Sequence, residues 1–423
     1  MAGLVPTTIR NPGTGNDMAL QDRLRDDVRE LERDIIRLRH QLHRRPEIGL
    51  QLPETQQAVL GALSDLPLET SVGTSCTSVT AVLRGTATAA GSGPAPAVLL
   101  RGDMDALPVR EPAAEFSSTI DGAMHACGHD LHIAMLAGAA RLLSAHRDAL
   151  CGDVVFMFQP GEEGYDGAGR MLAEGVLEAA GPRVQRAYGM HVIAGNLARG
   201  QFTTRPGTMM ASSDGLAVTV TGTGGHGSAP HRARDPISVA AEMIDSLQTM
   251  VTRQFDIFDP VVVTVGSFHA GTKRNIIPEQ ATFDATVRTF SPAARERIET
   301  ASVRLCQAIA AAHGLEADVR FTTEYPVTAN DPVQAEFAAG VVADVFGADR
   351  FTPMRTPDAG AEDFSRVLEQ VPGCYLFLGA CPQDDFEAAA DNHSPLAQFD
   401  DSVLADGCLL HANLAIRALQ GIS

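Results

Sequence analysis

The densest group of reactive side chains in the sequence is the segment His125-Ala-Cys-Gly-His-Asp-Leu-His132, in which five metal-capable side chains fall within eight residues. The segment stands directly before a predicted helix, so a loop there can direct several of these side chains at one point. Histidines gathered at the start of a helix would give the same pattern without a metal. The segment therefore indicates a metal site only together with further ligands elsewhere in the chain.

A second reactive pattern follows an apolar segment, 153–158, that is predicted to be a strand. The chain there runs into Gln159-Pro-Gly-Glu-Glu-Gly164. Neighbouring side chains point to opposite sides of an extended backbone, so Glu163 can bind a cation while Glu162 faces a bound water. The pair predicts a metal ligand beside a general base. Two solvent-exposed glutamates on a turn would give the same sequence pattern.

Two single histidines complete the candidate ligand set. His191 ends a predicted strand over 186–191, and His393 lies in a loop; each alone is more typical of a structural residue. Most of the candidates follow strands, where open α/β sheets place their sites. Five ligands with S, N and O donors suit two metals that share a bridge, and favour Zn²⁺, Mn²⁺, Co²⁺ or Ni²⁺ over Ca²⁺ or Mg²⁺. The five are Cys127, His129, Glu163, His191 and His393.

Three other carboxylates are candidates for supporting roles. Asp103 and Asp105 follow a predicted strand over 97–102, where a carboxylate can accept a hydrogen bond from a ligating histidine and orient it. Glu362, in Gly-Ala-Glu-Asp, is a weaker candidate for a carboxylate in the cleft. Loop acids that cap a turn would fit the first pair equally well, so both interpretations stay open.

The elements that must position these side chains alternate between strand and helix. Strands are predicted at 78–83, 97–102, 153–158 and 186–191, with a helix over 131–146. Such alternation predicts an α/β domain with a doubly wound, largely parallel sheet.

From about residue 206 the order of elements changes to strand, helix, two strands, helix and a last strand near 317–323. This is the ferredoxin-like order, and it predicts an inserted α+β domain. We therefore expect a flexible N-terminal tail at 1–18, a catalytic domain in two parts at 19–205 and 324–423, and the inserted domain at 206–323.

Composition narrows the class of protein. The 423 residues carry 52 acids against 33 bases, and this net charge of −19 disfavours partnership with nucleic acids or anionic membranes. Seven cysteines without a C-x-x-C pair, and no signal peptide or membrane span, predict a cytoplasmic protein. Lys273 is the only lysine, a bias typical of a GC-rich bacterial genome.

Eight motifs occur in the order found in a known family, and they extend from about Leu31 to the C-terminus. The chain resembles the metal-dependent N-acyl-amino-acid amidohydrolases, a group of metallopeptidase-like enzymes that includes aminoacylases, hippurate hydrolases and plant auxin-conjugate hydrolases. The motifs are RGDMDALP (101–108), MHACGHD (124–130), FQPGEEG (158–164), YGMHV (188–192), GGHGSAPH (224–231), NIIPEQATFDATVRTF (275–290), GAEDFS (360–365) and NHSP (392–395).

The resemblance implies roles for single residues. The five candidate ligands match residues that hold two divalent metals, Glu162 matches the general acid/base, and Asp105 matches a carboxylate that orients a ligand or the base. The inserted domain is similar to a lid that also carries a homodimer interface. From this lid His226, Asn275 and Arg288 match residues that contact substrate, and in related enzymes the equivalent of His226 reaches the partner subunit's site. Gly161 stands where many relatives carry Ala, and we expect that exchange to be neutral.

The implied reaction is hydrolysis of the amide bond of an N-acyl amino acid to a carboxylic acid and a free amino acid. Two metals lower the pKa of a water towards about 7, and Glu162 takes its proton. His226 would stabilise the oxyanion, and Arg288 with Asn275 would hold the carboxylate of the amino acid.

Two alternatives keep the same architecture. One is a dipeptidase or exopeptidase, which the resemblance disfavours because those peptidases carry an aspartate where Cys127 stands. The other is a binding protein that has lost activity, which the presence of Glu162 and of all five candidate ligands disfavours.

A third alternative is an NAD-linked oxidoreductase, because Gly222-Thr-Gly-Gly-His-Gly227 fits G-x-G-x-x-G after a predicted strand. The segment leads into Ser-Ala-Pro-His instead of a helix, and the next predicted strand, 261–269, ends without an acid for a ribose. Its context therefore disfavours a dinucleotide site.

Overall fold

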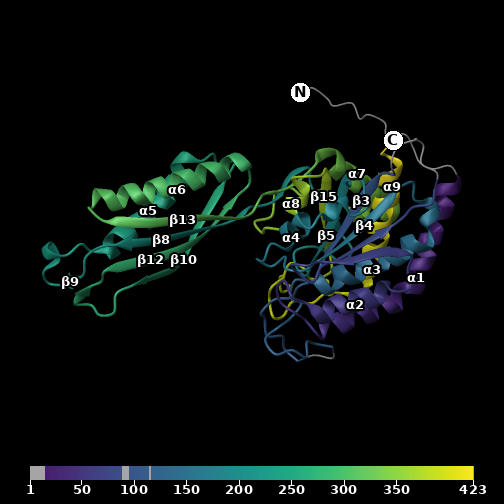
Figure 1. The fold of residues 1–423 in the computed structure, drawn as a ribbon, viewed down its shortest axis with the longest axis horizontal. Helices are drawn as coiled ribbons and strands as arrows, with labels where there is room; N and C mark the ends of the chain where they lie inside the picture. The colour runs from purple at the N-terminus through teal and green to yellow at the C-terminus, as the bar shows by residue number, and fades with distance from the viewer. Residues whose placement is uncertain (1–14, 88–94, 114–115, 423) are drawn as a thin grey trace, which may run out of the picture.

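The computed structural model describes residues 15–87, 95–113 and 116–422. The chain forms a larger domain, which holds both ends of the described chain, and a smaller domain set apart from it along the long axis of the molecule (Figure 1). Two separate main sheets, one of seven strands and one of four, form the frameworks of these domains.

The larger domain is built on the seven-stranded sheet, in the order β1-β2-β4-β3-β5-β15-β6. Its four inner strands, β4, β3, β5 and β15, are parallel, whereas β1, β2 and β6 join antiparallel at the edges. The predicted α/β class with a largely parallel sheet is confirmed. The strands are β1 (Leu68–Val72), β2 (Val79–Leu83), β3 (Ala97–Asp103), β4 (Asp153–Gln159), β5 (Arg186–Ile193), β6 (Phe202–Thr203) and β15 (Gly373–Gly379).

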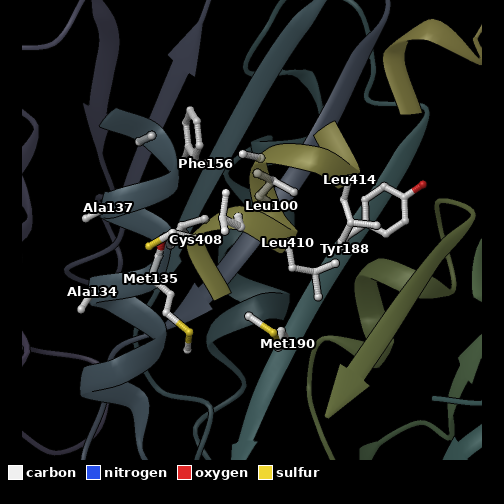
Figure 2. Close-up of a cluster of buried hydrophobic side chains, with 14 of the residues drawn as sticks. Leu100, Ala134, Met135, Ala137, Phe156, Tyr188, Met190, Cys408, Leu410 and Leu414 are labelled. Carbon is white, nitrogen blue, oxygen red and sulfur yellow. The ribbon is translucent and has the colours of Figure 1, made fainter. Parts of the chain in front are cut away.

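Helices cover both faces of this sheet, so the inner strands are buried on both sides. Leu100 on β3 packs in the core shared with α3 and α9, while its neighbour Leu99 packs in a second core with residues of α4 and α8. Figure 2 shows the first core, where Met135 of α3 and Leu410 of α9 meet the sheet. The helices are α1 (Gly15–His43), α2 (Pro53–Leu63), α3 (His129–Ala145), α4 (Gly167–Ala173), α7 (Pro332–Phe346), α8 (Ser365–Leu368) and α9 (Leu404–Gln420).

The smaller domain has the predicted ferredoxin-like order of elements. Its sheet is antiparallel throughout, with the order β10-β12-β8-β13. Asp235 and Ser291 cap the N-termini of its two helices, which pack on one face of the sheet. The elements are β8 (Ser213–Thr221), α5 (Pro236–Gln254), β10 (Val261–Ala270), β12 (Gln280–Thr289), α6 (Pro292–Ala312) and β13 (Glu316–Tyr325).

Several short elements were not predicted, because two to four residues carry too little periodicity to be read from sequence. One pair, β7 with β14, lies where the chain enters and leaves the smaller domain, and a second, β9 with β11, belongs to that domain. These elements are β7 (Gly207–Met210), β9 (Gly225–His226), β11 (Ile276–Ile277), β14 (Thr328–Asn330) and the 3₁₀ turns η1 (Arg147–Ala149), η2 (Val176–Glu178), η3 (Pro230–Arg232), η4 (Ala348–Arg350) and η5 (Asp401–Val403).

Two boundaries differ from the predictions. Helix α1 begins at Gly15, inside the segment 1–18 expected to be a tail, and residues 1–14 lie outside the described residues. Helix α3 begins at His129, two residues earlier than predicted, so His129 belongs to its first turn. Within the described residues, no helix combines the length and the apolar character needed to cross a membrane.

Candidate active site

The candidate site lies at the carboxyl edge of the parallel strands. Asp103 ends β3, Glu162 and Glu163 follow its neighbour β4, and His191 lies near the end of β5. Parallel strands bring these ends to one edge of the sheet, which is where open α/β sheets bind ligands.

The loop before α3 brings Cys127 and His129 to the same edge. Gly128 between them has a φ of 81°, and a Cβ there would approach Val192 Cγ2 to 2.4 Å. Glycine adopts this left-handed conformation without steric cost, so the loop can turn tightly against β5.

The structure brings all five predicted ligand residues together. Sγ of Cys127 lies 3.3 Å from Nε2 of His191 and 3.2 Å from Nε2 of His393, and Nε2 of His393 lies 3.1 Å from Oε1 of Glu163. Two groups have their ligand atoms within 4.8 Å of one another: Cys127 with His129 and His191, and Cys127 with Glu163 and His393. Cys127 is common to both groups, so its Sγ could serve as a ligand in each of them.

The chemistry of these groups fits two divalent metal ions. Both ring nitrogens of His129 are buried without a hydrogen-bond partner among the described residues, and the buried Oε1 of Glu163 has only its ionic contacts with the candidate ligands His393 and His129. Buried polar atoms without partners are costly, and a cation would satisfy them. Nδ1 of His191 lies 2.7 Å from the carbonyl oxygen of Val192, and a proton shared there leaves Nε2 free to act as a ligand. His393 has a φ of 69°, a strained conformation that functional sites often hold.

Glu162 has the environment of a general acid/base. Its side chain is 7% exposed, and a carboxylate oxygen lies within 4.8 Å of ligand atoms of His129 and Glu163. Burial, and then the neighbouring Glu362 carboxylate, raise the pKa of Glu162 well above its usual value. A carboxyl group with a raised pKa can both accept and return a proton near neutral pH.

Asp105 and Tyr325 hold the turn that carries Glu162. The carboxylate of Asp105 accepts hydrogen bonds from the backbone N–H groups of Glu162 and Glu163, at 2.9 and 3.0 Å. The Tyr325 hydroxyl donates to the carbonyl oxygen of Glu162 at 2.7 Å. A carboxylate oxygen of Asp105 also lies 3.6 Å from Nδ1 of His129. This one carboxylate therefore contacts both the turn that carries Glu162 and a candidate ligand.

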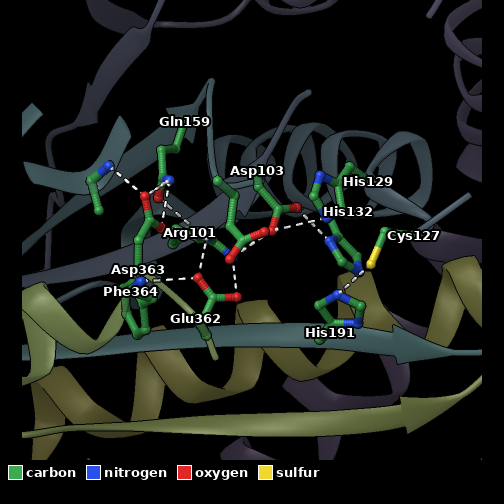
Figure 3. A network of polar contacts seen from close by, with 12 residues as sticks. Arg101, Asp103, Cys127, His129, His132, Gln159, His191, Glu362, Asp363 and Phe364 are labelled. Atoms are coloured by element: carbon green, nitrogen blue, oxygen red, sulfur yellow. Dashed lines mark hydrogen bonds and ion pairs between the residues drawn. The ribbon is translucent and has the colours of Figure 1, made fainter. Parts of the chain in front are cut away.

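A buried network behind the ligands was only partly predicted. Asp103 lies 2.5 Å from Nδ1 of His132 and accepts a hydrogen bond at 2.6 Å from Arg101, as Figure 3 shows. Burial opposes ionisation of Asp103, but Arg101 and the two histidines hold its pKa well below the usual range. Sequence reasoning named Asp103 but missed Arg101 and the role of His132. The apolar strand around Arg101 was a signal, because a buried arginine must have partners.

Glu162 and four of the candidate ligands, Cys127, Glu163, His191 and His393, line a cleft of about 810 Å³ between the two domains. Arg288, one of the predicted substrate contacts, also lines it, and the guanidinium group makes no ion pair among the described residues. One wall is apolar and is formed by Ile193, Leu197, Met210, Met354 and Phe377.

The other two predicted lid contacts do not reach this cleft. His226 and Asn275 are exposed and lie by the paired strands β9 and β11, where β9 stands at the far end of the smaller domain (Figure 1). Nδ1 of His226 lies 2.8 Å from the hydroxyl of Ser228. A single chain in this arrangement therefore leaves both residues outside its own site.

Gly161 was expected to tolerate alanine, and the structure contradicts this. Its φ is 72°, and a Cβ would approach Cδ2 of Leu50 to 2.6 Å. An alanine would meet both a left-handed backbone and a steric clash. Gly161 therefore helps to form the turn before Glu162.

The segment Gly222–Gly227 does not form a dinucleotide site. It leads from β8 through β9 to η3, and the next helix, α5, begins only at Pro236. A pyrophosphate needs a helix N-terminus directly after the glycines, in a parallel sheet, and here the sheet is antiparallel.

Comparison with known proteins agrees with this fold. The sequence model of "Peptidase family M20/M25/M40" matches residues 99–417. Thermostable carboxypeptidase 2 of Saccharolobus solfataricus is 36% identical, over 95% of this chain and 99% of its own length. IAA-amino acid hydrolase ILR1-like 4 of Arabidopsis thaliana is 36% identical, over 91% of this chain and 86% of its own.

Among solved structures, the YXEP protein of Bacillus subtilis, described as a dinuclear metal binding peptidase from the M20 family, superposes with a TM-score of 0.78. It is 30% identical, and the match covers 93% of this chain and 100% of that one. The fold and the ligand set define a metal-dependent hydrolase acting on amide bonds. The chain belongs to peptidase family M20/M25/M40, and the resemblance found in its sequence is confirmed.

Proposed function

We propose that the protein hydrolyses the amide bond of N-acyl amino acids and releases a carboxylic acid and a free amino acid. The observation that carries the proposal is Cys127, shared by two groups of ligand atoms directly beside the buried carboxyl group of Glu162. A pair of cations beside a poised carboxylate is the arrangement that metal-assisted amide hydrolysis requires.

Two divalent ions would be held by Cys127, His129, Glu163, His191 and His393, and would supply Lewis acidity and an acidified water. Manganese, zinc, cobalt and nickel all suit these donors. Glu162 takes the proton of the attacking water, because its carboxylate faces His129 and Glu163. The same carboxyl group then returns the proton to the leaving amine, as its raised pKa favours.

The cleft supports a substrate that is apolar on one side of the scissile bond and anionic on the other. Its apolar wall of Leu197, Met210 and Met354 suits an acyl group, and Arg288 suits the carboxylate of the released amino acid. The relatives named as a carboxypeptidase and as an IAA-amino acid hydrolase are consistent with a substrate that carries an amino acid at this end.

The lid completes the site only in a homodimer under this proposal. His226 and Asn275 lie outside the cleft of their own chain, and a partner's lid would bring them to it. There His226 would donate a hydrogen bond to the developing oxyanion, and Asn275 would assist Arg288. Light scattering that shows a monomer at the concentration of an active assay would contradict this part.

We place the enzyme in the bacterial cytoplasm, which its seven free cysteines support. A dipeptidase or exopeptidase remains the second candidate, favoured by the similarity to a carboxypeptidase.

The deciding experiment measures amino acid release by LC–MS from N-acetyl, N-benzoyl and indole-acetyl amino acids and from dipeptides, with manganese-loaded enzyme. Glu162→Gln and chelator-treated enzyme are the controls. We expect release from the acylated amino acids that both controls abolish. Cleavage of dipeptides alone would make the protein a peptidase, and full turnover by Glu162→Gln would refute the role of Glu162.

A further inference from the structure

A buried cluster of charged and polar side chains lies directly behind the turn that carries Glu162. We call it the Arg101 cluster, and Figure 3 shows its centre. All of its side chains are buried, and they come from β3, β4, β15 and the segment directly before α8. Its members are Arg101, Asp103, Gln159, Glu362, Asp363 and Tyr375.

Arg101 is the only cation of this cluster, and it holds three carboxylates. Its guanidinium donates to Asp103 at 2.6 Å, to Glu362 at 2.7 Å and to Asp363 at 3.3 Å. One positive charge therefore faces three acids in a site without solvent. The excess of carboxylates makes the cluster a region that another negative group must avoid.

Glu362 is the member of the cluster that also lines the cleft. Its Oε1 accepts hydrogen bonds from Arg101 and from the backbone N–H of Phe364, at 2.7 and 2.9 Å. Its Oε2 accepts from the hydroxyl of Tyr375 and from Arg101. Four donors from three residues leave this carboxylate no freedom to rotate, so it forms a fixed part of the cleft wall.

Glu162 presents the opposite case. No described residue donates a hydrogen bond to its side chain, yet ligand atoms of Glu362 and Asp363 lie within 4.8 Å of one another and of its carboxylate. No hydrogen bond from a described residue therefore fixes this carboxylate. Its direction depends on repulsion from the neighbouring carboxylates.

We infer that Glu362 is a positioning residue for the general base. Its fixed carboxylate repels the side chain of Glu162 and keeps it turned towards His129 and Glu163, where the water is deprotonated. The inference rests on the proposed function, because it takes Glu162 as the general base. It gives a role to the motif Gly-Ala-Glu-Asp, which sequence analysis could only mark as a weak candidate.

The test compares manganese-loaded wild type with Glu362→Gln, by high-resolution crystal structures and by steady-state kinetics. Gln keeps the shape of the side chain but offers an N–H donor to Glu162, so the carboxylate of Glu162 should swing towards residue 362. We expect kcat to fall roughly 100-fold, as a displacement of about 1 Å can cause, with KM changed less than about twofold. Metal content should be unchanged.

Two further variants separate positioning from structural damage. Glu362→Asp keeps the charge one methylene further back, so kcat should recover most of the loss and Glu162 should keep its wild-type direction. Asp214→Asn is the matched control, because Asp214 is also buried and is held by two nitrogens of Arg295, but in the lid. It should lower the melting temperature without changing kcat.

Each result decides one question. If Glu162 stays in place in Glu362→Gln, or moves while kcat stays at the wild-type value, the inference is wrong. If Glu162→Gln retains turnover, the proposed function fails instead. If the wild type cleaves no substrate of the panel, the substrate class fails, and the direction of Glu162 in the crystal structures still decides the inference.

Discussion

One strand from each of the two main sheets shows an opposite placement of charged side chains. On β3 of the catalytic domain, Arg101 is fully buried and binds three buried acids. On β13 of the lid, Arg320 pairs with Asp318 at 2.9 Å while their side chains are 75% and 60% exposed. A sheet covered on both faces can hold ions at fixed places in a medium of low dielectric, whereas a sheet covered on one face leaves them in water.

The burial of the strands shows the same difference. Every residue of β3, β4 and β15 is buried, whereas β12 in the lid alternates between buried and more exposed positions. The larger domain therefore supplies the buried part of the candidate site, whereas the smaller domain contributes Arg288 to the cleft and leaves His226 and Asn275 exposed outside it. The predictions below test this division, from the largest expected effect to the smallest.

Replacing the buried cation should be the most damaging change. In Arg101→Met three buried carboxylates lose their partner, and removing one partner of a buried ion pair costs roughly 3–5 kcal/mol. In Arg320→Met the exposed pair should cost no more than about 1 kcal/mol. Denaturant unfolding of both variants checks the contrast. Equal stabilities would show that the two sheets do not differ in the way proposed.

His226→Ala tests whether the lid acts chemically despite its distance from the cleft. Removing one donor to an oxyanion lowers kcat roughly 10²–10³-fold, about 3–4 kcal/mol, and we expect that loss with an unchanged melting temperature. Mixing this variant with Glu162→Gln and allowing subunits to exchange should restore activity, because the mixed dimer has one intact site. No recovery in exchanged dimers would mean that His226 does not act across the interface.

A pH-dependent stability is expected from the buried contact between His43 on α1 and Asp130 on α3. Burial opposes protonation of His43, but Asp130 and Glu111 outweigh it and raise the pKa to about 9. Because the pKa is raised, the stabilisation is fully present below about pH 6.5 and is lost as the pH rises through 9. It amounts to about 3 kcal/mol.

The check is the free energy of unfolding of metal-free wild type and His43→Gln between pH 6 and about 10. The difference between the two should be largest at the acid end and should shrink as the pH rises. A difference that does not change with pH would show that the pKa of His43 is the same in the folded and the unfolded protein.

Arg288→Gln should have the smallest effect. Losing one hydrogen bond to a charged group costs about 1.5 kcal/mol or more, so KM should rise roughly tenfold while kcat changes little. A second substrate, in which an amide replaces the carboxylate of the amino acid, sharpens the test. Wild type and Arg288→Gln should have similar KM values for it. If kcat falls instead, Arg288 acts on the transition state.

Sequence patterns predicted the framework well where the periodicity is long. The order of elements predicted from about residue 206 is the one observed, and its strand β12 (Gln280–Thr289) has a long alternating pattern of burial. The short pairs β7–β14 and β9–β11 could not be predicted, because their register depends on tertiary contacts.

The candidate site was predictable to the extent that its residues lie in local motifs. Four of the five ligand candidates stand near strand ends or the start of α3, so topology brings them together, whereas His393 comes from a loop. Sequence reasoning missed the connection from Arg101 through Glu362 to the cleft wall, because 261 positions separate these residues and only the folded chain joins them. It also misjudged Gly161, whose need for a left-handed backbone depends on Leu50 packing against the turn.

The membership of Cys127 in both groups of candidate ligands has a consequence for how the chain folds. Its partner His393 lies 266 residues further along, beyond the whole of the lid. Contacts over such long stretches of chain form late, because their loop-closure entropy must be overcome first. Binding of metal by both groups would therefore occur only at the end of folding. A nascent chain that lacks the last 31 residues contains the whole lid but only four of the five candidate ligands.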